Sequence, residues 1–206
     1  MKVRDYHFIF PTEQLFNYGS TKEVTRLLNS LSLLFPVGER FFMDSIRAWE
    51  PLVTDEKLLE DIKIFYKQEG RHGREHTKLN KMLAKHGVDI AALNKDILAI
   101  LQKHGYDKEH ALMATTSLER LTGALGYGLT IFDRYILKDN PYSDLWRYHA
   151  VEEVEHVHVS EELAKRFLKF TTVEQGRFLL IALFEVLRQT YKHYKLLKKI
   201  EPINTK

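Results

Sequence analysis

The stretch HAVEEVEH, residues 149–156, places two histidines and three glutamates close together with no proline or glycine between them. We expect this stretch to be helical. On an ideal helix, His149 lies about 40° to one side of Glu153 and His156 about 60° to the other. The sequence therefore predicts that these three side chains share one face.

Leu145, Ser160 and Leu163 extend the same face, which predicts that it points into a helical bundle. A buried carboxylate without a partner is strongly destabilising, or it takes up a proton. A buried Glu153 flanked by histidines therefore needs a compensating positive charge, which a metal ion would supply.

Glu152 and Glu155 lie about 100° and about 160° away from Glu153 on the same helix. We expect them on the charged exterior, or behind the other side chains as their hydrogen-bond partners. Taken alone, HAVEEVEH is better explained as a solvated face with charges paired one turn apart. The case for a metal depends on the rest of the chain.

A second Glu-x-x-His pair, Glu69 and His72, stands in QEGRHGREH, with His76 one turn further on. Apolar residues predict that this side also faces inward, and they are Ile62, Phe65, Leu79 and Leu83. His76 fits an eighth ligand, an ordinary core histidine, or a hydrogen-bond partner that orients a ligand. We favour the orienting role, because ligating groups normally need such support.

Two single glutamates complete the pattern. Glu39 shares its face with Phe42, Met43 and Ile46, and Glu119 lies in a stripe of apolar and small residues. The stripe includes Gly123 and Gly126, with Gly128 nearby. These glycines are explained by close helix packing, with space for a substrate or dioxygen as the alternative.

The order along the chain is Glu39, then Glu69 and His72, then Glu119, then Glu153 and His156. One glutamate from each of two helices plus Glu-x-x-His from each of two others is the ligand arrangement of ferritin-like di-iron and di-manganese proteins. Four carboxylates would neutralise two divalent ions. His149 would add a third imidazole and make the two metal positions inequivalent.

Helical periodicity after residue 20, broken by proline and glycine, predicts an all-α fold. We expect a ferritin-like four-helix bundle with additional helices and an extended N-terminal arm over residues 3–15, and we interpret residues 1–206 as a single domain. The expected helices cover residues 21–35, 36–49, 54–86, 90–105, 107–138, 143–170 and 172–199.

Composition limits the function classes. The 206 residues include no cysteine, which excludes disulfides and thiolate ligands, so any metal must use His and carboxylate groups. A net charge of +3 gives no strong reason to expect a nucleic-acid partner. The N-terminal MKVRDYHFIF lacks the features of a signal peptide, so we expect a cytoplasmic protein.

The longest apolar run, residues 178–184, is far shorter than the roughly 20 residues of a membrane span, so no transmembrane segment is expected. The last expected helix pairs this run with the basic KHYKLLKK, which suits the end of a bundle helix. The alternative is peripheral contact with a membrane or a lipid-like substrate. A homodimer is compatible with the sequence.

The chain resembles the ferritin-like family of predicted metal-dependent hydrolases through VRDYHFIF, LNSLSLLFPVGERFF, FYKQEGRHGREHTKLN, TTSLERLTG and LWRYHAVEEVEH. It is also similar in ligand pattern to the di-iron p-aminobenzoate N-oxygenases, in which a third histidine joins four glutamates and two histidines. The resemblance implies the metal ligands Glu39, Glu69, His72, Glu119, His149, Glu153 and His156. Arg120 is a departure, since the family often has histidine after the glutamate of its third helix.

These observations favour an enzyme that uses two metal ions, which we expect to be iron with manganese and zinc as alternatives, and O₂ to oxidise a small organic substrate. Glu39, Glu119 and His149 would take part in catalysis. The alternatives are hydrolysis by a metal-activated water, and non-catalytic iron storage or metal binding.

Overall fold

The computed structural model describes residues 1–4 and 6–201, and in this part of the chain it confirms an all-α fold. The described residues contain no strand, apart from one isolated bridge between Gly19 and Leu137. The α-helices are α1 (Lys22–Ser32), α2 (Phe35–Arg47), α3 (Glu56–Ala84), α4 (Ile90–His104), α5 (Lys108–Ile136), α6 (Pro141–Phe167) and α7 (Thr172–Ile200). Two short 3-10 helices, η1 (Thr12–Gln14) and η2 (Glu50–Leu52), complete the elements.

Side-chain caps define where most of the helices begin. Asp55, Asp89 and Asp107 each accept a hydrogen bond from a backbone N–H in the first turn of α3, α4 and α5. Thr171 forms a reciprocal capping box with Glu174 at the start of α7. These polar side chains satisfy backbone donors that have no partner inside the helix.

Helix α6 begins earlier than the sequence predicts. We expected a turn at Asn140 and Pro141, but the Asn140 side chain accepts a hydrogen bond from the Ser143 backbone and caps the helix. Pro141 then occupies the first helical position, where its missing N–H costs nothing. Ser143 itself is buried and donates to the Tyr18 carbonyl.

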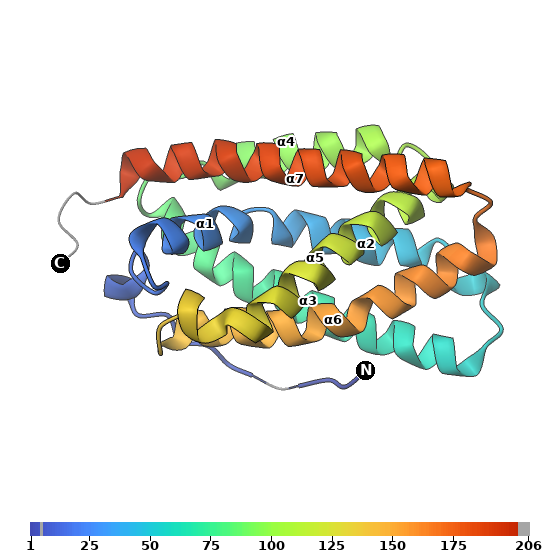
Figure 1. Cartoon of the computed structure of the whole chain (residues 1–206), viewed down its shortest axis with the longest axis horizontal. Coiled ribbons are helices and arrows are strands. Elements are labelled where there is room, and N and C mark those ends of the chain that lie inside the picture. The colour runs from blue at the N-terminus through green and yellow to red at the C-terminus, as the bar shows by residue number, and fades with distance from the viewer. Residues whose placement is uncertain (5, 202–206) are drawn as a thin grey trace.

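Helices α1 and α2 follow one another through the middle of the molecule (Figure 1). Helices α3 and α6 lie on one side of them, α4 and α7 cover the other side, and α5 runs obliquely from α4 and α7 to α6. Pro36 separates α1 from α2 because it has no backbone N–H to continue the first helix, yet it fits the first turn of the second. This arrangement surrounds one interior with α2, α3, α5 and α6.

Two apolar clusters fill the ends of that interior. One gathers around Leu79, Leu83 and Leu145, and the other around Phe65, Leu112 and Leu163. On both α3 and α6, the buried residues between the two clusters include glutamates and histidines. The fold therefore holds a polar layer between two apolar layers.

The N-terminal arm has no regular structure before η1 among its described residues. Arg4 joins it to α6 by donating to Glu152 and Glu155 at 3.2 and 2.6 Å. Among the residues that the structure describes, no helix is long and apolar enough to cross a membrane.

Candidate metal centre

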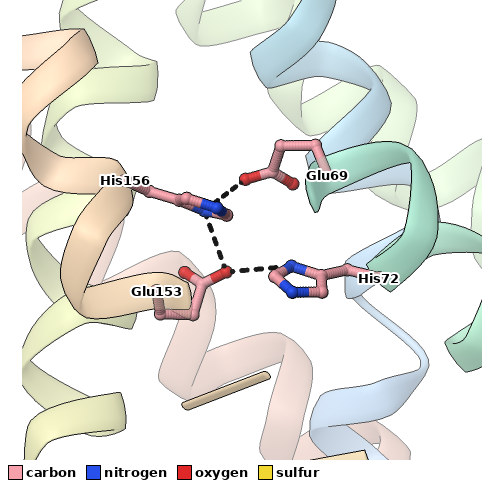
Figure 2. Close-up of side chains that lie close together, drawn as sticks. All are labelled: Glu69, His72, Glu153 and His156. Atoms are coloured by element: carbon pink, nitrogen blue, oxygen red, sulfur yellow. Dashed lines mark ion pairs between the residues drawn. The ribbon is translucent and has the colours of Figure 1, made fainter. Parts of the chain in front are cut away.

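The polar layer contains all seven residues that the sequence predicts as metal ligands. Glu39 comes from α2, Glu69 and His72 from α3, and Glu119 from α5, while α6 contributes the other three. All seven side chains are buried. In Figure 2, Glu69 and His72 on α3 face Glu153 and His156 on α6.

Glu69, His72, Glu153 and His156 form a first group whose ligand atoms all lie within 4.8 Å of one another. The Nδ1 atom of His156 is 2.7 Å from Oε1 of Glu69 and 3.4 Å from Oε1 of Glu153. The Nδ1 atom of His72 lies 3.5 Å from that same Glu153 oxygen. Glu153 therefore stands between the two histidines (Figure 2).

Glu39, His72 and His149 form a second group with ligand atoms within 4.8 Å of one another. The Nε2 atom of His149 also lies 2.9 Å from Oε1 of Glu153. The two groups share His72, so they are neighbours. Glu119 belongs to neither group, but its buried carboxylate is close enough for Glu69 and Glu153 to act on it electrostatically.

The facing atoms of these residues have no hydrogen-bond partner among the described residues, although several are close together. They are both carboxylate oxygens of Glu39, Glu69 and Glu119, Oε2 of Glu153, Nδ1 of His72, Nε2 of His149 and both ring nitrogens of His156. Buried polar atoms are rarely left without a partner. Converging lone pairs of carboxylate and imidazole are the ligands that divalent metal ions take, so the residues present fit a metal.

The electrostatics also favour a cation between these carboxylates. Burial raises the pKa of Glu39 and Glu119 well above its ordinary value, and the charges of Glu69 and Glu153 raise it further. Burial likewise raises the pKa of Glu69. Several carboxylates packed together in this way repel one another unless cations lie between them.

Glu153 is the exception among the glutamates. Its burial alone would raise its pKa, but His149, His156 and His72 together bring the pKa well below the ordinary value. Burial and the neighbouring charge of His72 lower the pKa of His149 to about 4. The histidines around Glu153 therefore favour its carboxylate form, the form in which it binds metals.

A chain of hydrogen bonds fixes the orientation of His149. The Asn80 side-chain amide donates to the Ser32 carbonyl at 2.9 Å, so its Oδ1 accepts the Ser32 hydroxyl proton at 2.8 Å. The single Ser32 hydroxyl proton is thus used, so the Ser32 oxygen accepts a hydrogen bond from Nδ1 of His76 at 2.9 Å. Nε2 of His76 then accepts a hydrogen bond from Nδ1 of His149 at 2.7 Å. The lone pair on Nε2 of His149 therefore faces the site. His76 lies where it can orient His149, which is the position that the favoured interpretation of the sequence requires.

Glu152 is not on the exterior of α6 but lies behind the other side chains as a hydrogen-bond partner, which was the second of the two positions expected for it. It is fully buried, and its Oε2 lies 3.1 Å from Nε2 of His72 while Oε1 accepts from Arg4. The reason is that α3 and the N-terminal arm cover this side of α6. A carboxylate on one ring nitrogen leaves the other nitrogen, Nδ1, for a metal.

Other polar residues of the motifs lie at the edge of the site or outside it. Glu155 is partly exposed and binds Arg4 and the Gln68 side chain. Arg120 pairs with Glu161 at 3.0 Å on the outer side of α5 and α6. Residue 120 therefore points away from the proposed ligands, and having arginine there instead of histidine does not change the ligand set.

The small residues of α5 allow close approach of α6. A Cβ atom at Gly123 would lie 2.6 Å from a Val157 methyl group, and one at Gly126 would lie 2.7 Å from the Ala150 carbonyl. Close packing is therefore the reason for both glycines. Gly73 on α3 leaves room for Glu39, whose Oε2 would be 3.0 Å from a Cβ there.

A cavity of about 340 Å³ reaches the site between α1, α5 and α6. His149 and Glu153 form part of its wall, and Gly128 lines it with nothing within 4 Å of an added Cβ. A second cavity, of about 120 Å³, adjoins it between α2, α4, α5 and α7. The space beside Gly128 agrees with the second interpretation of these glycines, which is that they leave room for a substrate or dioxygen.

Comparison with known proteins places the chain in a family. No curated protein and no solved structure matches it. A family described as "predicted metal-dependent hydrolase" matches residues 2–204, which is nearly the whole chain. The buried His and Glu group could bind a metal ion, as that description requires. The chain therefore belongs to the family of predicted metal-dependent hydrolases.

Proposed function

We propose that the protein is an enzyme with a ferritin-like centre of two metal ions that uses O₂ to oxidise a small organic molecule. The ligands are Glu39, Glu69, His72, Glu119, His149, Glu153 and His156. The observation that carries the proposal is the set of buried, converging carboxylate and imidazole atoms without hydrogen-bond partners. We interpret the chain as one domain built around this centre.

The ligand chemistry supports iron. Mixed imidazole and carboxylate ligands suit iron and manganese, and four glutamates balance the charge of two divalent ions. Two iron ions in this set would supply the binding and reduction of O₂. A buried cage of glutamates on helices differs from the solvent-exposed loops that commonly hold hydrolytic metals.

The residues of this chain prepare the site for that chemistry. Glu152 and His76 fix the rings of His72 and His149, so that one nitrogen of each faces inward. The apolar clusters on both sides exclude bulk water, which protects a reactive site from side reactions. Glu39 and Glu119 carry no competing hydrogen bonds and are free to change their binding mode.

The overall reaction must balance. In an insertion of oxygen into a C–H or N–H bond, one atom of O₂ enters the substrate and the other leaves as water. The bond supplies two electrons, and a reduced flavin or ferredoxin-type protein must supply the other two with two protons. The proposal therefore requires an electron donor from outside this chain.

Hydrolysis is the second candidate, and the description of the family supports it. Two metal ions can activate a water molecule and polarise an ester, amide or phosphate group. Against it, the cavity wall offers no acid for a leaving group besides the proposed ligands. Thr122 and Trp146 also line the cavity, but each already donates a hydrogen bond within the protein.

The test starts with the metals in the purified protein and ends with O₂. Protein loaded with Fe(II) under anaerobic conditions should consume O₂ rapidly, and Glu153→Ala should lose this reaction together with at least one metal ion. Bound zinc, turnover of an ester or phosphoester, and no O₂ consumption would overturn the proposal in favour of hydrolysis. Growth of a ferric mineral would indicate storage instead.

A further inference from the structure

The larger cavity has an apolar wall, whereas the proposed metal site at its inner end is polar. Besides the proposed ligands His149 and Glu153, only Thr122 and Trp146 among its lining residues carry a polar side chain. Thr122 donates to the Glu119 carbonyl at 3.2 Å, and Trp146 donates to the Tyr18 hydroxyl at 3.2 Å. The wall therefore offers a ligand apolar contact, and its unpartnered polar atoms belong to the metal site.

The cavity is accessible from outside the protein. Leu27, Leu125 and Phe132 line it and are 43%, 55% and 53% exposed. They come from α1 and α5, so the opening lies between these two helices. Large apolar side chains at an opening favour molecules that are themselves apolar.

The smaller cavity continues the apolar wall. It shares Leu31, Phe35, Thr122 and Leu125 with the larger one, and its other polar lining residues are His104 on α4 with Glu185 and Gln189 on α7. An elongated molecule would therefore meet apolar side chains along its length. A compact polar or charged molecule would find few partners in either cavity.

We propose that the substrate is a molecule with an unbranched hydrocarbon chain, which lies in the larger cavity with the chain directed at His149 and Glu153. This inference rests on the proposed function, because it makes the cavity the substrate site of the metal centre. Affinity should come from apolar burial, and each buried methylene should strengthen binding about fourfold. Affinity should stop rising once the chain fills the cavity.

Gly128 offers a variant that blocks the cavity without harming the fold. Gly128 is an interior residue of α5 and lines the cavity, where an added side chain would meet open space. Leucine is also a better helix former than glycine. Gly176→Leu is the matched control, since Gly176 is also helical, also has nothing within 4 Å, and lies outside both cavities. Gly128→Ala gives an intermediate step.

The experiment measures binding of hexanol, decanol and tetradecanol by calorimetry to anaerobic protein loaded with Fe(II), and to metal-free protein. Affinity should rise with chain length in the wild type and in Gly176→Leu. It should fall about tenfold or more in Gly128→Leu, by less in Gly128→Ala, with unchanged metal content. Affinity independent of chain length, or equal in Gly128→Leu and the wild type, would overturn the inference.

The two proposals fail in different ways. Metal content and O₂ consumption are measured on the same preparations. If the protein holds no metal but Gly128→Leu still blocks chain-length-dependent binding, the proposed function fails and the cavity assignment stands. If metal is bound and O₂ is consumed without alkanol binding, only the cavity assignment fails.

Discussion

Glu152 shows how one buried side chain orients a proposed ligand on another helix. Its carboxylate lies against Nε2 of His72, and Arg4 holds its other oxygen. We predict that Glu152→Gln weakens metal binding about 10- to 100-fold, because loss of such a partner changes both the orientation and the basicity of the imidazole. Competition with a chelator of known affinity measures this effect.

Glu161→Gln on the same helix is the control, since Glu161 pairs with Arg120 away from the ligands. It should bind metal as the wild type does. Equal metal affinity in Glu152→Gln and Glu161→Gln would show that Glu152 does not support His72.

His76 tests the hydrogen-bond chain behind His149. His76→Leu removes the acceptor for Nδ1 of His149, so this ring should lose its fixed orientation and metal affinity should fall about 10-fold. His76→Gln carries a carbonyl oxygen that can accept the same proton, and it should recover part of the affinity. A His76→Gln variant as weak as His76→Leu would contradict the role assigned to His76.

The sharing of one helix face by the proposed ligands could be predicted from the sequence. The spacing of Glu153 and His156 places them on one face by geometry alone, and the structure brings them together with Glu69 and His72. The sequence left open whether Glu152 lies on the exterior or supports another side chain, because a helical angle gives a direction and not what lies there. The side chains of His72 and Arg4, distant in sequence, make that direction an interior one.

Packing between α5 and α6 depends on which glycine is replaced. A methyl group at Gly126 would lie 2.7 Å from the Ala150 carbonyl and 3.2 Å from Cβ of Glu153. Gly126→Ala should therefore lower the free energy of unfolding by about 1–3 kcal/mol, as overpacking does, and should disturb Glu153. Gly128→Ala meets open space and should raise it by up to about 1 kcal/mol.

Urea denaturation of both variants and the wild type measures this difference. The opposite signs matter more than the magnitudes, because both substitutions add the same methyl group to the same helix. If Gly126→Ala were as stable as Gly128→Ala, α5 and α6 would not be in the close contact described.

Helix α7 contributes a pH-dependent contact with α1. His193 is buried and hydrogen-bonded to the Ser30 carbonyl, and burial lowers its pKa. Because the unfolded chain takes up a proton near pH 6.5, stability from neutral His193 is present above that pH and is lost as pH falls toward the folded pKa. The loss is at most about 1.4 kcal/mol per pH unit.

His193→Gln keeps a hydrogen-bond donor but does not titrate. Its free energy of unfolding should therefore fall less steeply than that of the wild type between about pH 7 and about pH 5. The difference between the two proteins isolates His193 from the other buried histidines. Parallel pH curves would show that His193 titrates alike in the folded and unfolded chains.

At the scale of elements, the sequence predicted every α-helix because proline, glycine and capping residues mark the ends. The start predicted for α6 was too late in the chain, because Asn140 and Pro141 suit a turn and a helix cap equally well. A tertiary contact decides between the two, since Ser143 in the first turn is buried and donates a hydrogen bond to the Tyr18 carbonyl. Such a contact has no local signal in the sequence.

We predict that metal binding is linked to folding through the polar layer between the two apolar clusters. Burial and the charges of Glu69 and Glu153 disfavour the carboxylate forms of Glu39 and Glu119 in the folded chain, and a bound cation would favour them. A ligand that binds only the folded state stabilises it, by about 4 kcal/mol at a thousand times its dissociation constant. The glycines of α5 suggested a space for a substrate, but the lining of the larger cavity was beyond the sequence, because it depends on how α1, α5 and α6 pack together.

Metal stoichiometry and thermal unfolding, measured on the same preparation, test most directly whether the chain binds two metal ions. We predict two iron ions per chain in protein reconstituted with Fe(II) under anaerobic conditions. It also predicts loss of at least one ion in Glu153→Ala and in His156→Ala, and a lower unfolding temperature after chelation. Full metal content in both variants, or an unfolding temperature unchanged by chelation, would contradict it.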